Sequence, residues 1–354
     1  MKKILSICMF ALLLFALIGC SSDTASEDTT DTEKPAETTE EKPADSSTDS
    51  TSGSESDRPD EYQITFPTGT TTGTYYPLGA IFADFWTKKL DYVQASSQAS
   101  NGSVQNLIFI KQGEAQLALT PIGTLYEAVH GVASFEGNQV DNVKILAGLY
   151  PNVNHLVARK GSGVEKIEDI AGKSIVPGAT GSATEVESQR TLAAYGVDYE
   201  ALKKDFVGFT EATDLMRNKQ VDAAMVMAGV PTSAVTEMLA TADGVLLPYS
   251  DEAIAKLQAD YPWTTEYVIE ANTYENQPEP VKSVAQFNFL VASADMPDDV
   301  AYDLVKTFWE NIEEISGSHA VIEQFKLEAA TSGTAGVALH PGAERYYKEA
   351  GVLN

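Results

Sequence analysis

Residues 62–79 read YQITFPTGTTTGTYYPLG. Apolar and polar residues first alternate, a polar loop follows, and the stretch ends where a helix with one apolar face is expected to begin. Apolar and polar side chains alternate over residues 62–66, which is the period of a strand with one buried face. From residue 78 to residue 89 the apolar side chains recur at helical spacing, and Leu78, Phe82 and Phe85 fall on one face. Glycine and threonine fill the loop between them and favour turns and helix starts. This stretch predicts a strand, a polar loop and a helix in succession.

A second stretch of the same kind begins near residue 173. Residues 173–176 predict a strand, residues 177–184 form a loop of Gly, Ser and Thr, and residues 185–195 predict a helix that ends before Gly196. Short apolar runs and amphipathic stretches alternate elsewhere, with strands expected at 143–149, 155–159, 223–227 and 286–292 and helices at 164–170 and 298–315. Such alternation is typical of βαβ units. We predict an α/β fold with two lobes, because the roughly 290 residues from 61 onward can form two cores.

Both polar loops lead into the N-terminus of a helix. Unpaired backbone N–H groups and the positive end of the helix dipole favour anions at this position. Two lobes that each present such a loop are therefore expected to form a cleft for an anionic ligand.

The first twenty residues have the pattern of an export signal that ends in a lipidated cysteine. Lys2 and Lys3 precede the apolar residues 4–18, a run shorter than the roughly 20 residues of a spanning helix. Gly19 before Cys20 resembles the lipobox of bacterial lipoproteins. We expect residues 1–19 to be removed and Cys20 to carry a diacylglycerol that anchors the protein at the outer face of the cell membrane. The alternative is an ordinary signal peptide with a chance cysteine.

Residues 20–60 are expected to form a disordered acidic tether. From residue 21 this segment contains no Leu, Ile, Val, Phe, Trp or Tyr and is rich in Ser, Thr, Asp and Glu. It has nothing to bury, and its carboxylates repel one another. Such a chain would hold a globular domain away from a membrane surface. Beyond the tether we expect lobe I at residues 61–155 and 276–354 and lobe II at residues 156–275.

Charge and motif content argue against several classes of protein. The net charge of −27 disfavours nucleic-acid binding, which needs a basic surface. The four histidines show no H-x-x-x-H spacing, and no G-x-S-x-G motif is present. The two cysteines, Cys8 and Cys20, both lie in the predicted export signal, so we expect no disulfide. The sequence thus predicts neither catalysis nor a metal nor a cofactor.

Several short motifs resemble the TAXI family, the extracytoplasmic solute receptors of tripartite ATP-independent periplasmic (TRAP) transporters. The resemblance begins in TGTTTGTYYPLG at residues 68–79 and continues in NGSVQNL at residues 101–107. It includes GSATE at residues 181–185 and AGVP at residues 228–231, and it ends in HPGAERYY at residues 340–347. The motifs follow the order found in the family and extend over nearly the whole chain beyond the tether.

This resemblance implies a type II periplasmic-binding-protein fold, in which two α/β lobes close on a small solute. It also implies delivery of that solute to a TRAP permease in the membrane, with uptake driven by an ion gradient. The implied ligand is glutamate, glutamine or a related C5 dicarboxylate. Two positions depart from the family pattern, because Thr72 and Ala183 stand where glycine is usual. Each adds a Cβ to a loop that is expected to contact the ligand.

The candidate binding residues lie mainly on the polar loops and the helix starts. Thr74 and Ser182 either hold a ligand carboxylate or act as ordinary helix caps. Arg159 and Arg190 are the candidate cations for a ligand acid, with ordinary salt bridges as the alternative. The full candidate set is Thr72, Gly73, Thr74, Tyr75, Asn101, Ser103, Thr120, Gly181, Ser182, Thr184, Gly229 and Pro231.

The sequence therefore predicts a lipid-anchored receptor for a small organic anion. Two alternatives from other classes are a surface adhesin or immunogenic lipoprotein without a transport role, and a surface hydrolase. A TRAP permease gene beside this one would favour the receptor, and turnover of a bound ligand would reveal the hydrolase.

Overall fold

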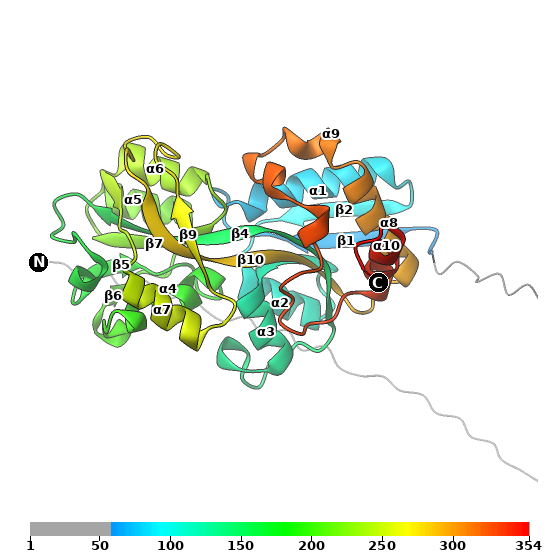
Figure 1. Ribbon diagram of the computed structural model, residues 1–354, viewed down its shortest axis with the longest axis horizontal. Helices are drawn as coiled ribbons and strands as arrows, with labels where there is room; N and C mark the ends of the chain where they lie inside the picture. The colour runs from blue at the N-terminus through cyan, green and yellow to red at the C-terminus, as the bar shows by residue number, and fades with distance from the viewer. Residues whose placement is uncertain (1–57, 354) are drawn as a thin grey trace, which may run out of the picture. The chain divides into compact units, whose positions relative to one another are not determined.

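The computed structural model describes residues 58–353, which belong to one compact unit (Figure 1). The predicted export signal, Cys20 and nearly all of the predicted tether lie outside the described residues. Within residues 58–353, no helix has both the length and the apolar character needed to cross a membrane.

Two β-sheets organise the fold. Strands β1 (Tyr62–Pro67) and β2 (Val93–Gln98) pair in parallel and are connected by helix α1 (Tyr75–Lys89). The larger sheet has the strand order β3-β10-β4-β7-β5-β6, with β8 paired to β4 and β9 paired to β10. Its strands are β3 (Leu117–Pro121), β4 (Val143–Arg159), β5 (Ser174–Val176), β6 (Lys203–Lys204), β7 (Ala223–Ala228), β8 (Gly244–Leu246), β9 (Thr265–Ile269) and β10 (Val281–Ser293).

The long strands β4 and β10 run through the middle of the fold, between α1, α2 and α3 on one side and β5, β7 and α5 on the other (Figure 1). They pair antiparallel over most of their length. The prediction of separate strands at 143–149 and 155–159 was wrong, because the residues between them stay in the ladder. Asn152 is paired with Gln286, and Val153 is paired with both Ala285 and Ala228.

Helices flank both sheets. Helix α1 begins at Tyr75, earlier than predicted, because Pro77 is tolerated in the first turn. The helix expected at 298–315 ends at Glu310 and is followed by a separate short helix. The expected helix at 164–170 is only a 3₁₀ turn at Ile167–Ile170. The remaining helices are α2 (Ser103–Lys111), α3 (Ile122–His130), α4 (Ala183–Ala194), α5 (Phe209–Arg217), α6 (Ser233–Thr241), α7 (Asp251–Asp260), α8 (Asp298–Glu310), α9 (Glu313–Ser316) and α10 (Pro341–Glu349).

The buried apolar side chains form four clusters that fall into two groups. Two clusters take their buried members from residues up to Tyr150 and from Phe289 onward, and the other two lie between Val153 and Ala285. We call the first group lobe I and the second lobe II. The cores therefore change over within β4 and within β10. The boundaries expected at 155/156 and 275/276 remain a prediction.

Helix α1 is held firmly against lobe I, which fixes the direction of its N-terminus. Leu78, Phe82 and Trp86 are fully buried, and the rings of Phe82 and Phe308 meet edge to face at 5.1 Å. Trp86 Nε1 also donates a hydrogen bond to the Leu304 carbonyl at 3.0 Å. Each such buried side chain contributes about 1.5–3 kcal/mol to folding. The loop that precedes α1 is thus presented from a rigid base.

Candidate functional site

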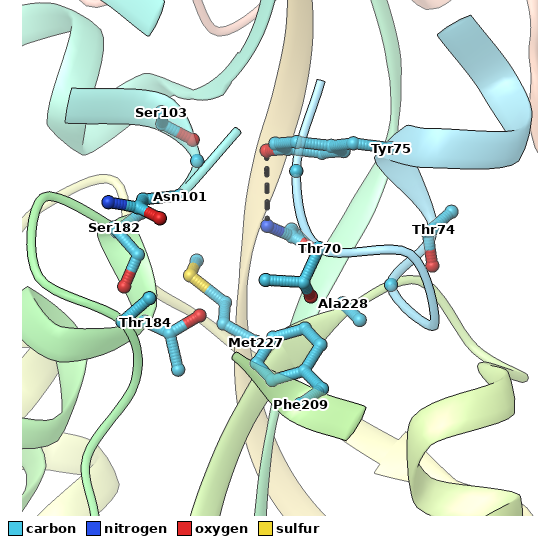
Figure 2. Close-up of a pocket in the computed structure, with 16 residues that line it drawn as sticks. Thr70, Thr74, Tyr75, Asn101, Ser103, Ser182, Thr184, Phe209, Met227 and Ala228 are labelled. Atoms are coloured by element: carbon cyan, nitrogen blue, oxygen red, sulfur yellow. Dashed lines mark hydrogen bonds between the residues drawn. The ribbon is translucent and has the colours of Figure 1, made fainter. Parts of the chain in front are cut away.

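A cleft between the lobes collects residues from six separate parts of the chain (Figure 2). The centre of a water molecule can move within a volume of about 40 Å³ inside this cleft. One water needs about 10–15 Å³ on this scale, so the cleft takes a compact solute. Its lining residues are Gly69, Thr70, Gly73, Thr74, Tyr75, Asn101, Gly102, Ser103, Asn152, Ala179, Ser182, Ala183, Thr184, Phe209, Met227 and Ala228.

The N-termini of three helices meet at this cleft. Helices α1 and α2 of lobe I begin at Tyr75 and Ser103, and α4 of lobe II begins at Ala183. No side chain caps α1 or α2, because Thr74 makes no cap hydrogen bond and Gly102 has no side chain. The first N–H groups of a helix have no partner within the helix, and the helix dipole makes this end positive. Together the three ends provide hydrogen-bond donors and a positive field for an anion.

Thr74 and Ser182 use their hydroxyl groups in different ways. Ser182 Oγ accepts the N–H of Glu185 at 3.1 Å and so caps α4, which was the alternative to ligand binding. Thr74 Oγ1 does not cap α1 but accepts the N–H of Gly229 at 3.0 Å, across the two lobes. The Thr74 acceptor is therefore occupied by an inter-lobe contact.

Backbone hydrogen bonds close the cleft from both sides. The N–H of Gln105 donates to the Gly181 carbonyl at 3.0 Å, and the N–H of Ala234 donates to the Thr72 carbonyl at 3.1 Å. With the bond between Gly229 and Thr74, these contacts hold the two lobes together around the lining residues. The structure thus shows the lobes in a closed arrangement.

The predicted binding residues fall into three sets. The structure brings together Gly73, Thr74, Tyr75, Asn101, Ser103, Ser182 and Thr184 in the lining. It places Thr72, Gly181 and Gly229 at the inter-lobe contacts just described. Thr120 is buried in β3, where its hydroxyl donates to the Pro121 carbonyl, and Pro231 borders a separate surface hollow. Neither of these two residues lines the cleft.

Sequence reasoning missed the rest of the lining. Gly69, Thr70 and Gly102 belong to the polar segments that were singled out, and their position beside named candidates was a usable signal. Asn152 lies inside the long strand β4, where a polar residue marks the change from one core to the other. The remaining lining residues are apolar. Ala179 and Ala183 lie in the loop that was expected to contact the ligand, whereas Phe209, Met227 and Ala228 are indistinguishable from core residues in sequence.

Uncharged polar groups occupy one wall of the cleft. Tyr75 Oη donates to Asn288 Oδ1 at 2.6 Å and accepts from Asn152 Nδ2 at 3.4 Å, the bond drawn in Figure 2. Burial raises the pKa of Tyr75 well above its usual value, so this phenol stays neutral. Thr70 Oγ1 and Asn152 Oδ1 are buried and have no hydrogen-bond partner among the described residues. These two atoms are available to a ligand.

Neither of the candidate arginines lines the cleft. Arg159 pairs with Asp222 at 3.2 Å. Arg190 is only 7 % exposed and pairs with Glu187 at 2.5 Å and, more closely still, with Glu127. The salt-bridge alternative therefore describes both residues. Because Glu127 lies on α3 and Arg190 on α4, the second ion pair joins lobe I to lobe II.

The buried pair is extended by an amide from β10. Gln286 Nε2 donates to Glu187 Oε1 at 2.7 Å, and the N–H of Gly123 donates to Gln286 Oε1 at 3.0 Å. Burial raises the pKa of Glu187 to about 7, since it disfavours the charged form. One guanidinium thus serves two buried carboxylates at the junction of the lobes.

Comparison with known proteins adds the family. A model described as the NMT1-like family matches residues 66–351. The chain belongs to the NMT1-like family. Among solved structures, MatC from Rhodopseudomonas palustris with bound malate is similar at 14 % identity, over 81 % of this chain and 96 % of MatC, with a TM-score of 0.51. A structure described as a periplasmic transporter is 12 % identical over 81 % of this chain and 92 % of its own, with a TM-score of 0.50.

A third similar structure is the alkanesulfonate-binding protein SsuA from Xanthomonas axonopodis pv. citri bound to MOPS. It is 13 % identical over 75 % of this chain and 83 % of its own, with a TM-score of 0.44. At these identities the likeness concerns the fold alone. The NMT1-like chain has the type II periplasmic-binding-protein fold, which confirms the predicted fold class.

The hydroxyl groups in the cleft of this NMT1-like chain have no acid–base partner within the lining. The hydroxyl groups of Ser103, Ser182 and Thr184 have no imidazole or carboxylate beside them among the lining residues, whereas an activated nucleophile needs such a base. Within residues 58–353, no group of three or more His, Cys, Asp or Glu side chains is arranged to hold a metal ion.

Proposed function

We propose that this NMT1-like protein is an extracytoplasmic solute receptor that captures a small organic anion between its lobes. The observation that carries the proposal is the meeting of the α1, α2 and α4 N-termini in one cleft. Two of these ends come from lobe I and one from lobe II, so an anion bound among them joins the lobes. The anion can contact both lobes at once only when they are closed. Ligand binding therefore favours the closed arrangement over an open one.

We also propose that the receptor delivers its ligand to a TRAP permease. The support is the TAXI-like motif series, whose segments at residues 68–79, 101–107 and 181–185 supply the three helix starts at the cleft. Glutamate, glutamine and related C5 dicarboxylates follow from the same resemblance and are the first compounds to test.

Thermal denaturation with candidate carboxylates tests the receptor role. A ligand present at one hundred times its dissociation constant stabilises the folded state by about 2.7 kcal/mol, which should raise the melting temperature by several degrees. Sodium chloride at equal ionic strength controls for general salt effects.

Asn101→Trp provides a matched variant for this experiment. Asn101 lines the cleft but is exposed, so the larger ring should obstruct the entrance without disturbing a core. The variant is expected to melt like the wild type without ligand and to lose the ligand-induced rise. If no C3–C6 carboxylate raises the melting temperature of the wild type, the proposed function is wrong.

We further propose that a lipid on Cys20 keeps the receptor at the membrane, near its permease. Cys20→Ala should release the protein into the medium or the periplasm, because no acyl chain remains to hold it. Cell fractionation and immunoblotting measure the distribution, and Cys8→Ala is the matched control, because Cys8 lies in the segment expected to be removed. A Cys20→Ala protein that stays in the membrane fraction would contradict the anchor.

A further inference from the structure

The lining of the cleft contains no charged side chain. None of the sixteen residues that line it in the described part of the chain is Asp, Glu, Lys, Arg or His. The acids of the adjacent α4 helix do not line the cleft: Glu185 accepts from Gln189 at 2.7 Å, and Glu187 pairs with Arg190. The electrostatic character of the cleft therefore comes from the backbone, and the three helix N-termini make it positive.

The positive field of the helix N-termini attracts the carboxylate of an amino acid and repels its ammonium group. A carboxylate is stabilised by helix N–H groups and by the positive helix ends. An ammonium group is repelled by the same ends and finds no carboxylate among the lining residues. In an α-amino acid the ammonium is attached to the carbon next to the carboxylate, so it cannot leave the region where the carboxylate binds. A buried charge without a partner is strongly disfavoured.

The neutral polar atoms of the cleft favour an uncharged polar substituent on the carbon next to the ligand carboxylate. Thr70 Oγ1 and Asn152 Oδ1 are buried without a partner, and the Asn152 side chain is only 2 % exposed. Together with the Asn152 amide nitrogen and the Thr70 hydroxyl, they offer both acceptors and donors. A ligand hydroxyl can donate to Asn152 Oδ1 or Thr70 Oγ1, and a ligand oxo group can accept from the Thr70 hydroxyl or the Asn152 amide, and neither group brings a charge.

The floor of the cleft limits the rest of the ligand. Phe209 and Met227 face the polar side chains in Figure 2, and three alanines complete the apolar surface. A short carbon chain can lie on this surface, and the small volume of the closed cleft excludes bulky groups.

We propose that the ligand is a small carboxylate that carries an uncharged hydroxyl or oxo group in place of an ammonium group. This inference rests on the receptor role proposed above and narrows its ligand class, because it excludes glutamate and glutamine in favour of short hydroxy and oxo acids.

Matched compounds that differ in one substituent test the inference. Isothermal titration calorimetry of the full-length protein would compare alanine with lactate and pyruvate, aspartate with malate, and glutamate with 2-hydroxyglutarate and 2-oxoglutarate. In the series that binds best, the hydroxy or oxo acid should bind roughly tenfold more tightly than the amino acid, or better. An amino acid that binds as tightly as its partner overturns the inference and leaves the receptor role standing. Absence of binding in all series overturns both.

A charge placed in the cleft provides the reciprocal experiment. Thr184 lies in the first turn of α4, where an aspartate is favourable for the helix. Thr184→Asp should shift the preference toward the amino acid by about tenfold relative to Thr184→Asn, which has the same shape without the charge. Equal preferences in the two variants would show that charge does not exclude the ammonium group and would overturn the inference.

Discussion

Replacing Arg190 with methionine is expected to lower the free energy of unfolding by about 3–5 kcal/mol. Arg190, Glu127 and Glu187 are all nearly inaccessible to solvent, at 5–7 % exposure. Removing the guanidinium leaves two carboxylates close together in the interior with no cation to compensate them. The guanidinium also lies 4.3 Å from the centre of the Tyr261 ring, and this contact is lost as well. Urea denaturation followed by circular dichroism measures the change.

Two further variants separate the charge effect from lost packing. Arg159→Met removes an arginine from a more accessible pair with Asp222 and should cost no more than about 1 kcal/mol. Combining Arg190→Met with Glu127→Leu and Glu187→Leu should recover most of the lost stability, since replacing a whole buried ionic group by apolar residues is often neutral. If Arg190→Met loses no more stability than Arg159→Met, the buried cluster does not hold the lobes as described.

The sequence could predict an element of structure where the residues that determine it are neighbours in the chain. The stretch from Tyr62 to Gly79 contains its own strand alternation, turn residues and helix stripe, and the structure follows it closely. Strand β4 was predicted as two strands, at 143–149 and 155–159, with Pro151 and Asn152 between them. In the fold, residues 150–153 pair with β10, and residues from Val153 onward also pair with β7. These partners are distant in sequence, so no local pattern could predict them.

At the site too, the sequence could not predict contacts between residues that are far apart in the chain. Arg190 has one partner nearby on its own helix, Glu187, but its closer partner Glu127 lies on α3, far away in sequence. The sequence therefore could not show that this arginine is fully engaged in salt bridges and does not reach the ligand. Thr120 was chosen because ligands bind at the carboxyl ends of strands in parallel sheets. Strand β3 instead pairs antiparallel with β10, and Thr120 faces the interior. Phe209 and Met227 have the composition of core residues, and only the packing of two lobes reveals their place in the cleft.

Replacing Gly102 with valine is expected to weaken ligand binding by about 100-fold or more. Gly102 precedes α2 with φ 123° and ψ −158°, a region that essentially only glycine occupies. A Cβ at this position would lie 3.3 Å from Ser182 Cβ, on the opposite lobe. The larger side chain therefore separates the N-termini of α2 and α4 and displaces the N–H groups of both helices that we propose hold the anion. Calorimetric titration with the tightest carboxylate measures the loss.

Gly113→Val is the matched control for this substitution. Gly113 also has a positive φ, of 75°, but a Cβ there meets nothing within 4 Å. Both variants should lose about 1–3 kcal/mol of stability to backbone strain, because both force valine into a disfavoured conformation. Only Gly102→Val should also lose affinity, since only Gly102 lies where the two helix ends meet. Equal affinities in the two variants would show that the junction of α2 and α4 is not where the anion binds, and the cleft would then need its positive field from α1 alone.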